Sequence, residues 1–149
     1  MRYVLDTNIL IHLVRDSDFG NKIADKFGFD NAENQLFISI VTKAEMLSLS
    51  MKSGWGNTKI TTLNSILDNL IILNITESVI TKYVEIDAYS QAKHPTLKLK
   101  NTHRNMGKND IWIAATTSAI FGTLITTDGD FEHLNGVFFD LIKVNLDIK

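Results

Sequence analysis

Residues 1–13 read Met-Arg-Tyr-Val-Leu-Asp-Thr-Asn-Ile-Leu-Ile-His-Leu and predict a strand that leads at once into a helix. Tyr3–Leu5 is a short apolar run of the kind found in buried strands. Asp6 ends that run, and Thr7 and Asn8 are favourable N-cap residues for the apolar helix that follows. Asp6 is therefore expected at the carboxyl end of a strand, the edge of an open α/β sheet where ligands bind.

Asp6 has two explanations at this stage. A carboxylate close to the protein interior is costly unless it is paired with a cation or binds a metal. Alternatively, Asp6 is only a helix cap, a common role for aspartate. The choice between them depends on the rest of the chain.

Length and composition indicate one globular domain over residues 1–149. Hydrophobic residues make up 44% and charged residues 21%, which is unlike a disordered chain. The absence of cysteine excludes disulfides, thiol catalysis and cysteine-ligated zinc. A net charge of −2 argues against binding to nucleic acid by overall basicity, so a polyanionic partner would need a local basic patch or bound cations.

The sequence also favours a cytoplasmic protein with no membrane partner. The N-terminal residues lack the pattern of a signal peptide. No apolar run approaches the roughly 18 residues of a membrane span. The lack of cysteine fits a reducing compartment.

Short apolar strands alternate with helical patterns along the chain, and this predicts a single α/β domain with a mainly parallel sheet flanked by helices. The expected strands are Tyr3–Leu5, Leu36–Ile40, Ile71–Asn74, Thr123–Thr126 and Val137–Val144. The expected helices are Ile9–Val14, Lys22–Phe29, Thr42–Met51, Thr58–Leu70, one from Thr76 that ends before His94, Asp110–Phe121 and a short turn at Asp128–Leu134. Residues 16–20 are expected to form a turn, Asn109 to cap its helix and Gly122 to close it.

Acidic residues stand at four of these junctions: Asp6, Glu45, Asp110 and Asp128. Each has a purely structural explanation. Thr42 to Glu45 matches a helix capping box, Asp110 in a first helical turn is favoured by the helix dipole, and Asp128 before Gly129 suits a turn or cap.

Taken together, the four acids favour a metal site. The carboxyl ends of parallel strands lie at one edge of a sheet, so acids at successive junctions can converge there. Asp110 also precedes the apolar residues 111–115, which places it near the interior. Several facing carboxylates need a divalent cation, and all-oxygen sites of this kind suit Mg²⁺ or Mn²⁺.

Four motifs in this order and spacing resemble those of PIN-domain ribonucleases, most closely the VapC-type toxins of prokaryotic toxin–antitoxin pairs. The motifs are Val4-Leu5-Asp6-Thr7-Asn8-Ile9-Leu10, Ile40-Val41-Thr42-Lys43-Ala44-Glu45-Met46, Gly107-Lys108-Asn109-Asp110-Ile111-Trp112-Ile113-Ala114-Ala115 and Leu124-Ile125-Thr126-Thr127-Asp128-Gly129-Asp130-Phe131. Each is weak alone, whereas the ordered set is specific. Residues 55–105 match nothing specific in the family.

The resemblance implies a PIN-like fold and metal-dependent cleavage of RNA phosphodiester bonds. The family's four acidic positions correspond to Asp6, Glu45, Asp110 and Asp128. Asp6 and Asp110 would be the chief ligands of the first Mg²⁺ or Mn²⁺, and the other two acids would complete the site, hold a second ion or orient the attacking water. Supporting roles around the site are expected from position alone for Asn8, Thr126, Asn109 and Asp130.

A basic tract leads directly into Asp110 and is expected to hold the RNA backbone, with a solvated loop as the alternative. Its members are Lys93, Lys98, Lys100, His103, Arg104 and Lys108, of which we select Lys100, Arg104 and Lys108. Trp112 is expected in the core. The resemblance also implies a cognate antitoxin that lies over the active site. It further implies a homodimer, and the helices Thr42–Met51 and Thr58–Leu70 would supply the dimer surface.

Other functions remain open. A PIN-type nuclease that processes RNA without being a toxin would have the same motifs. A non-catalytic module could use its acids to hold a structural ion or a basic partner. A phosphatase of the haloacid dehalogenase type would need a second aspartate where Asn8 stands, and no Gly-x-x-x-x-Gly-Lys loop supports a P-loop enzyme.

Overall fold

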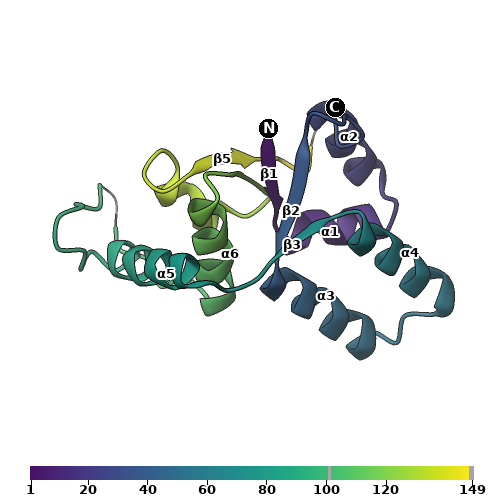
Figure 1. Ribbon diagram of the computed structural model, residues 1–149, viewed down its shortest axis with the longest axis horizontal. Coiled ribbons are helices and arrows are strands. Elements are labelled where there is room, and N and C mark those ends of the chain that lie inside the picture. The colour runs from purple at the N-terminus through teal and green to yellow at the C-terminus, as the bar shows by residue number, and fades with distance from the viewer. Residues whose placement is uncertain (101, 148–149) are drawn as a thin grey trace.

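The computed structural model describes residues 1–100 and 102–147 and contains one five-stranded sheet within them (Figure 1). All strand pairs are parallel, in the order β3-β2-β1-β4-β5, which confirms the predicted α/β class. The strands are β1 (Arg2–Leu5), β2 (Gln35–Ser39), β3 (Ile71–Leu73), β4 (Thr123–Thr126) and β5 (Asp140–Lys143).

Helices cover both faces of the sheet. They are α1 (Thr7–Val14), α2 (Asp18–Phe27), α3 (Ile40–Lys52), α4 (Asn57–Asp68), α5 (Glu77–Ser90), α6 (Lys108–Ala119) and the 3₁₀ helix η1 (Gly129–Leu134). In Figure 1, α5 and α6 lie side by side on one side of the sheet, and α1 and α4 lie on the other. Within the described residues, no helix combines the length and apolarity needed to cross a bilayer.

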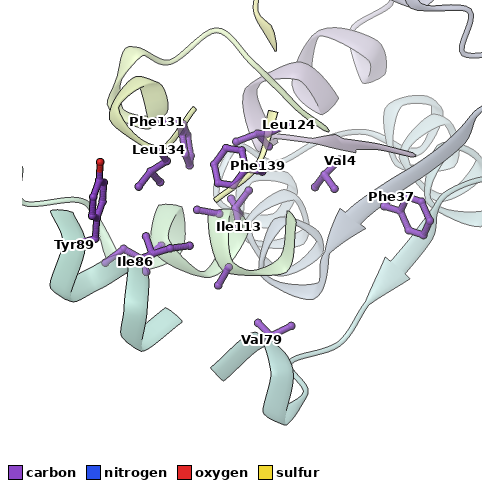
Figure 2. Close-up of a cluster of buried hydrophobic side chains, with 13 residues drawn as sticks. Val4, Phe37, Val79, Ile86, Tyr89, Ile113, Leu124, Phe131, Leu134 and Phe139 are labelled. Carbon is purple, nitrogen blue, oxygen red and sulfur yellow. The ribbon is translucent and has the colours of Figure 1, made fainter. Parts of the chain in front are cut away.

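Two hydrophobic cores hold these layers together, because successive residues of a buried strand point to opposite faces. Val4 and Leu124 pack with Ile113 of α6 and Ile86 of α5 in the cluster of Figure 2. On the opposite face of β1, Leu5 belongs to the second cluster, which includes residues of α1, α3 and α4. Burial on both faces explains why the strands read as continuous apolar runs instead of alternating ones.

The direction of the strand order reverses between β1 and β4, the position in an open α/β sheet at which ligands generally bind. From β1 the chain builds outward through β2 and β3, and it then returns to build β4 and β5 on the other side. Such a reversal opens a crevice at the carboxyl ends of the two adjacent strands. Leu5 pairs with Ile125, and the backbone N–H of Asp6 donates to the Ile125 carbonyl at 3.1 Å, so the residues that follow these strands lie close together.

Several predicted element boundaries were wrong. Residues 16–20 do not form only a turn, because α2 begins at Asp18 with the Ser17 hydroxyl accepting from the backbone N–H of Gly20. This helix ends at Phe27 instead of Phe29, where Gly28 adopts a left-handed conformation (φ 61°). The final strand is also shorter than Val137–Val144 and covers only Asp140–Lys143.

The predicted helix caps also need correction. Asp6 itself caps α1, instead of Thr7 or Asn8. The capping box at Thr42 was wrong, because α3 begins two residues earlier and is capped by Ser39. The cap of α6 is Gly107, not Asn109. Its C-terminal end is formed by Ile120 and by Phe121, which takes the positive φ (54°) expected of Gly122.

Candidate active site

Asp6 is held rigidly where β1 meets α1. Its side chain is only 4% exposed. One carboxylate oxygen accepts from the backbone N–H of Thr7 at 2.7 Å, and the other accepts from the hydroxyl of Thr126 at 2.6 Å. The two explanations of Asp6 are therefore compatible, because the residue caps α1 and also faces the end of β4.

Thr126 connects Asp6 to the turn that carries the next acids. Besides donating to Asp6, its hydroxyl accepts from the backbone N–H of Asp128 at 2.9 Å. The Asp128 carboxylate in turn accepts from the backbone N–H of Asp130 at 2.9 Å. The turn after β4 is thus shaped by side-chain hydrogen bonds that leave both carboxyl groups at the crevice.

Glu45 is oriented by Thr7, a residue for which the sequence suggests only a role as a helix cap. The hydroxyl of Thr7 donates to a Glu45 carboxylate oxygen at 2.7 Å and lies 3.3 Å from the hydroxyl of Thr42. Thr42 and Glu45 are three residues apart on α3 and so share a helix face. The spacing of Thr42 and Glu45 was visible in the sequence, whereas their meeting with Thr7 depends on the fold.

Asp110 joins the acids that follow β4. Oxygen atoms of Asp110, Asp128 and Asp130 all lie within 4.8 Å of one another, close enough to bind one ion. Asp130, for which only a supporting role was predicted, is a full member of this cluster. Glu45 and Asp110 also line a common hollow of about 510 Å³ with Gly107, Lys108 and Asn109.

Burial and mutual repulsion raise the pKa values of two of the acids. Burial, followed by the charges of neighbouring acids, raises the pKa of Asp6 to about 6 and that of Asp110 to about 6. The acids acting on Asp110 include Asp6, Asp128 and Glu45. Carboxylates that resist joint ionisation, with oxygen donors only, fit a hard divalent cation such as Mg²⁺ or Mn²⁺.

The other predicted supporting residues differ in position. Asn8 is half-buried, and its side-chain carbonyl oxygen has no hydrogen-bond partner among the described residues. Thr126 is buried and contacts Asp6 directly. Asn109 is exposed and lines the hollow beside Asp110.

The three selected basic residues also differ. Lys108 is exposed at the first position of α6 and lines the hollow that contains Asp110. Arg104 is already engaged, since its guanidinium donates to the Gly129 carbonyl at 3.2 Å and lies 3.9 Å from the Asp130 carboxylate. Lys100 is exposed, and no contact joins it to the acids within the described part of the chain.

Solved structures with this fold include several toxin–antitoxin proteins. VapBC2 from Rickettsia felis, bound to a DNA fragment from its promoter, matches with a TM-score of 0.77 at 22% identity. VapBC-1 from nontypeable Haemophilus influenzae gives 0.73 at 24%. VapBC-5 from Mycobacterium tuberculosis, a member of the VapBC family of toxin–antitoxin systems, gives 0.64 at 20%. Each match covers 96% of this chain and 98% of the other.

Sequence comparison identifies the family. A search of curated proteins finds no match. In contrast, residues 3–137 match the PIN domain model, a span that includes all five acids of the crevice. PIN domains are generally nucleases, which supports a hydrolase acting on phosphodiester bonds. The chain belongs to the PIN domain family.

Proposed function

We propose that this protein is a metal-dependent endoribonuclease and the toxin of a toxin–antitoxin pair. The observation that carries the proposal is the convergence of acids from separate elements at the β1–β4 crevice, with the pKa values of Asp6 and Asp110 raised to about 6. Family membership supports phosphodiester cleavage. The VapBC structures support the toxin assignment through the shared fold.

Each acid has a distinct role in the proposal. Asp6 and Asp110 are the main ligands of Mg²⁺ or Mn²⁺, and Asp128 completes the site with support from Asp130. The bound ion lowers the pKa of its water and neutralises charge at the phosphate. Glu45, held by Thr7, accepts a proton from the attacking water or orients it.

The side chains around the acids have supporting roles in the same proposal. Thr126 holds Asp6 in one orientation. Asn8 has an unpartnered carbonyl oxygen and lies two residues after Asp6, so it is proposed to hydrogen-bond a water of the site. Among the basic residues, Lys108 is best placed to bind the RNA backbone. Lys100 is a second candidate, whereas the Arg104 guanidinium already donates to the Gly129 carbonyl and is proposed to shape the site instead.

Partners and compartment are part of the proposal as well. An antitoxin and a second copy of the chain are proposed to bind it in the cytoplasm. The helices expected to form the dimer surface expose apolar side chains, namely Leu47 (42%) and Met51 (86%) on α3 and Ile60 (37%) on α4. Exposed apolar groups of this size suit a protein interface.

The test is cleavage of a pool of structured RNAs by the purified protein with Mg²⁺ or Mn²⁺ and with EDTA. We expect metal-dependent cleavage that Asp6→Asn and Asp110→Asn each abolish while remaining folded. Asp68→Asn, which changes an exposed acid on α4, is the matched control and should cleave normally.

Different outcomes separate the alternatives. Metal binding without cleavage of any RNA would contradict the nuclease and favour a binding module. The protein can also be expressed in cells without an antitoxin. If it cleaves RNA but does not inhibit growth there, an RNA-processing role is favoured over a toxin.

A further inference from the structure

A second hollow lies next to the one that contains Asp110. It measures about 550 Å³ and lies between α3 and α6. Both hollows are lined by Glu45 and Asn109, so they adjoin each other at these two side chains. The second is also lined by Ser48, Lys52 and Trp112. A molecule bound at the acids would extend into this space.

The second hollow differs chemically from the first. Trp112, expected in the core, is only half-buried and lines this hollow. Its ring packs against Tyr83 with centroids 4.1 Å apart, which restrains the indole. Lys52 is exposed at the end of α3, and the Asn109 amide is exposed at the mouth shared with the acids. The hollow thus combines an aromatic ring, a cation and an amide.

We propose that the second hollow binds the unpaired nucleotide next to the phosphodiester that is cleaved. The base packs against Trp112, Asn109 hydrogen-bonds its edge, and Lys52 binds the adjoining phosphate. The inference rests on the proposed nuclease function. The size is suitable, since sites for small molecules measure roughly 300–1,000 Å³.

The position of the second hollow next to Glu45 and Asp110 favours RNA over a protein segment as the occupant. A nucleotide strand that places one phosphate at Asp110 must place its next nucleotide close by, and the second hollow is the adjoining space. A base packs on an aromatic ring only when it is unstacked. The subsite therefore selects single-stranded RNA at this position.

Binding can be measured on Trp112 directly. The chain contains two tryptophans, so Trp55→Phe leaves Trp112 as the sole tryptophan, whose emission can be excited selectively over that of tyrosine. Combined with Asp6→Asn to prevent cleavage, this protein is titrated in Mg²⁺ with a single-stranded RNA hexamer and with a blunt RNA duplex. We expect the hexamer to quench the fluorescence of Trp112 at concentrations at which the duplex does not.

Cleavage kinetics provide the second measurement, in the protein with Asp6 intact. Loss of base stacking commonly weakens binding by roughly 5- to 150-fold. Trp112→Leu should raise KM for a single-stranded substrate within that range, and Trp112→Phe should restore most of it. Lys52→Gln should raise KM, whereas Lys26→Gln on α2, which lines neither hollow, should not. Asn109→Ala should alter the base preference beside the cut.

The outcomes distinguish this subsite from the proposed function. Metal-dependent cleavage with KM unchanged in Trp112→Leu and Lys52→Gln would overturn the subsite and leave the nuclease intact. Equal quenching by hexamer and duplex would also overturn it. Quenching by the hexamer alone, with no cleavage by any form of the protein, would contradict the nuclease and with it the position beside a cleaved bond, while showing that the hollow binds single-stranded RNA.

Discussion

Two threonine hydroxyls orient the acids of the crevice. Thr126 donates to Asp6, and Thr7 donates to Glu45. Hydrogen bonds of this kind stabilise the ionised carboxylate and so oppose the effect of burial on its pKa. For Asp6 the Thr126 hydrogen bond lowers the pKa, but burial outweighs it. The two hydroxyls therefore hold the carboxylates of Asp6 and Glu45 in defined orientations despite the repulsion between the acids.

We expect Thr7→Val to reduce kcat/KM for RNA roughly 10- to 100-fold, because residues that orient groups in a metal site commonly have effects of that size. Thr7→Ser keeps the hydroxyl and should stay close to the unchanged protein. Steady-state cleavage in Mn²⁺ measures both variants. Loss of activity in the serine variant with normal activity in the valine variant would instead indicate a packing role for the methyl group.

Although Glu45 lies in the second turn of α3, which begins at Ile40, the sequence indicated where the other acids would converge, because each follows a strand or lies in the first turn of a helix at the same sheet edge. It did not predict that Asp130 would join Asp110 and Asp128, since this depends on a turn shaped by side-chain hydrogen bonds. The contact of Thr7 with Glu45 was also beyond reach, because 38 residues separate the two. The sequence pattern predicts on which strand or helix a residue lies, whereas these contacts depend on the direction in which each side chain points.

The segment between α5 and α6 is attached to the crevice at Arg104. The backbone N–H of Arg104 donates to the Ser90 carbonyl at 2.7 Å, and the Arg104 guanidinium donates to the Gly129 carbonyl at 3.2 Å. Arg104 therefore connects the end of α5 with the start of η1, next to Asp128. A residue in this position contributes to the shape of the site even without contacting RNA.

We expect Arg104→Gln to lower the free energy of unfolding by about 1 kcal/mol, as loss of one partly exposed hydrogen bond implies. The salt dependence of RNA binding should change little.

Lys108→Gln should leave the free energy of unfolding unchanged. It should reduce the slope of the logarithm of the RNA binding constant against the logarithm of the salt concentration by about one. Urea unfolding and RNA titrations at several salt concentrations measure these effects. A reduced salt slope in Arg104→Gln would instead identify Arg104 as a phosphate contact.

At the level of elements, the order and type of strands and helices were predictable, but several ends were not. Ile40 is β-branched and extends an apolar run, so it was assigned to a strand, although Ser39 caps the helix that begins with Ile40. Lys108 and Asn109 precede the apolar part of α6, which hid the first turn of that helix. Local propensity is a weak guide where tertiary contacts determine the boundary.

In the molecule as a whole, bringing the acids together lowers the free energy of unfolding when no cation is bound, because buried carboxylates repel one another. Asp6 comes from the end of β1, Glu45 from α3, Asp110 from α6 and Asp128 from the turn after β4. A carboxyl group whose pKa is raised on folding binds more protons in the folded than in the unfolded state. Its effect on stability therefore becomes more unfavourable as pH rises from about 4 through about 6.

We expect Asp6→Asn to be more stable than the unchanged protein in EDTA at pH 7.5, and this difference to shrink at pH 5. The rise in the pKa of Asp6 to about 6 corresponds to about 3 kcal/mol as an upper bound. For a chain of this length, each kcal/mol shifts Tm by roughly 2–4 °C. Thermal melts at both pH values measure the change.

Mn²⁺ provides the control for this experiment. At pH 7.5 it should raise the Tm of the unchanged protein more than that of Asp6→Asn, because the ion replaces the repulsion with attraction. A stability difference that does not change with pH would contradict the assignment of raised pKa values to this crevice.

The hydrogen bond between Thr126 and Asp6 spans 120 positions of sequence. On a ribosome, β1 emerges long before its neighbour β4, because more than a hundred residues separate the two strands. The two halves of the crevice therefore cannot meet until the residues of β4 have been translated. Contacts so distant in sequence also slow folding. A cell that makes this protein thus has an interval, set by translation and folding, in which the polypeptide exists without an assembled crevice.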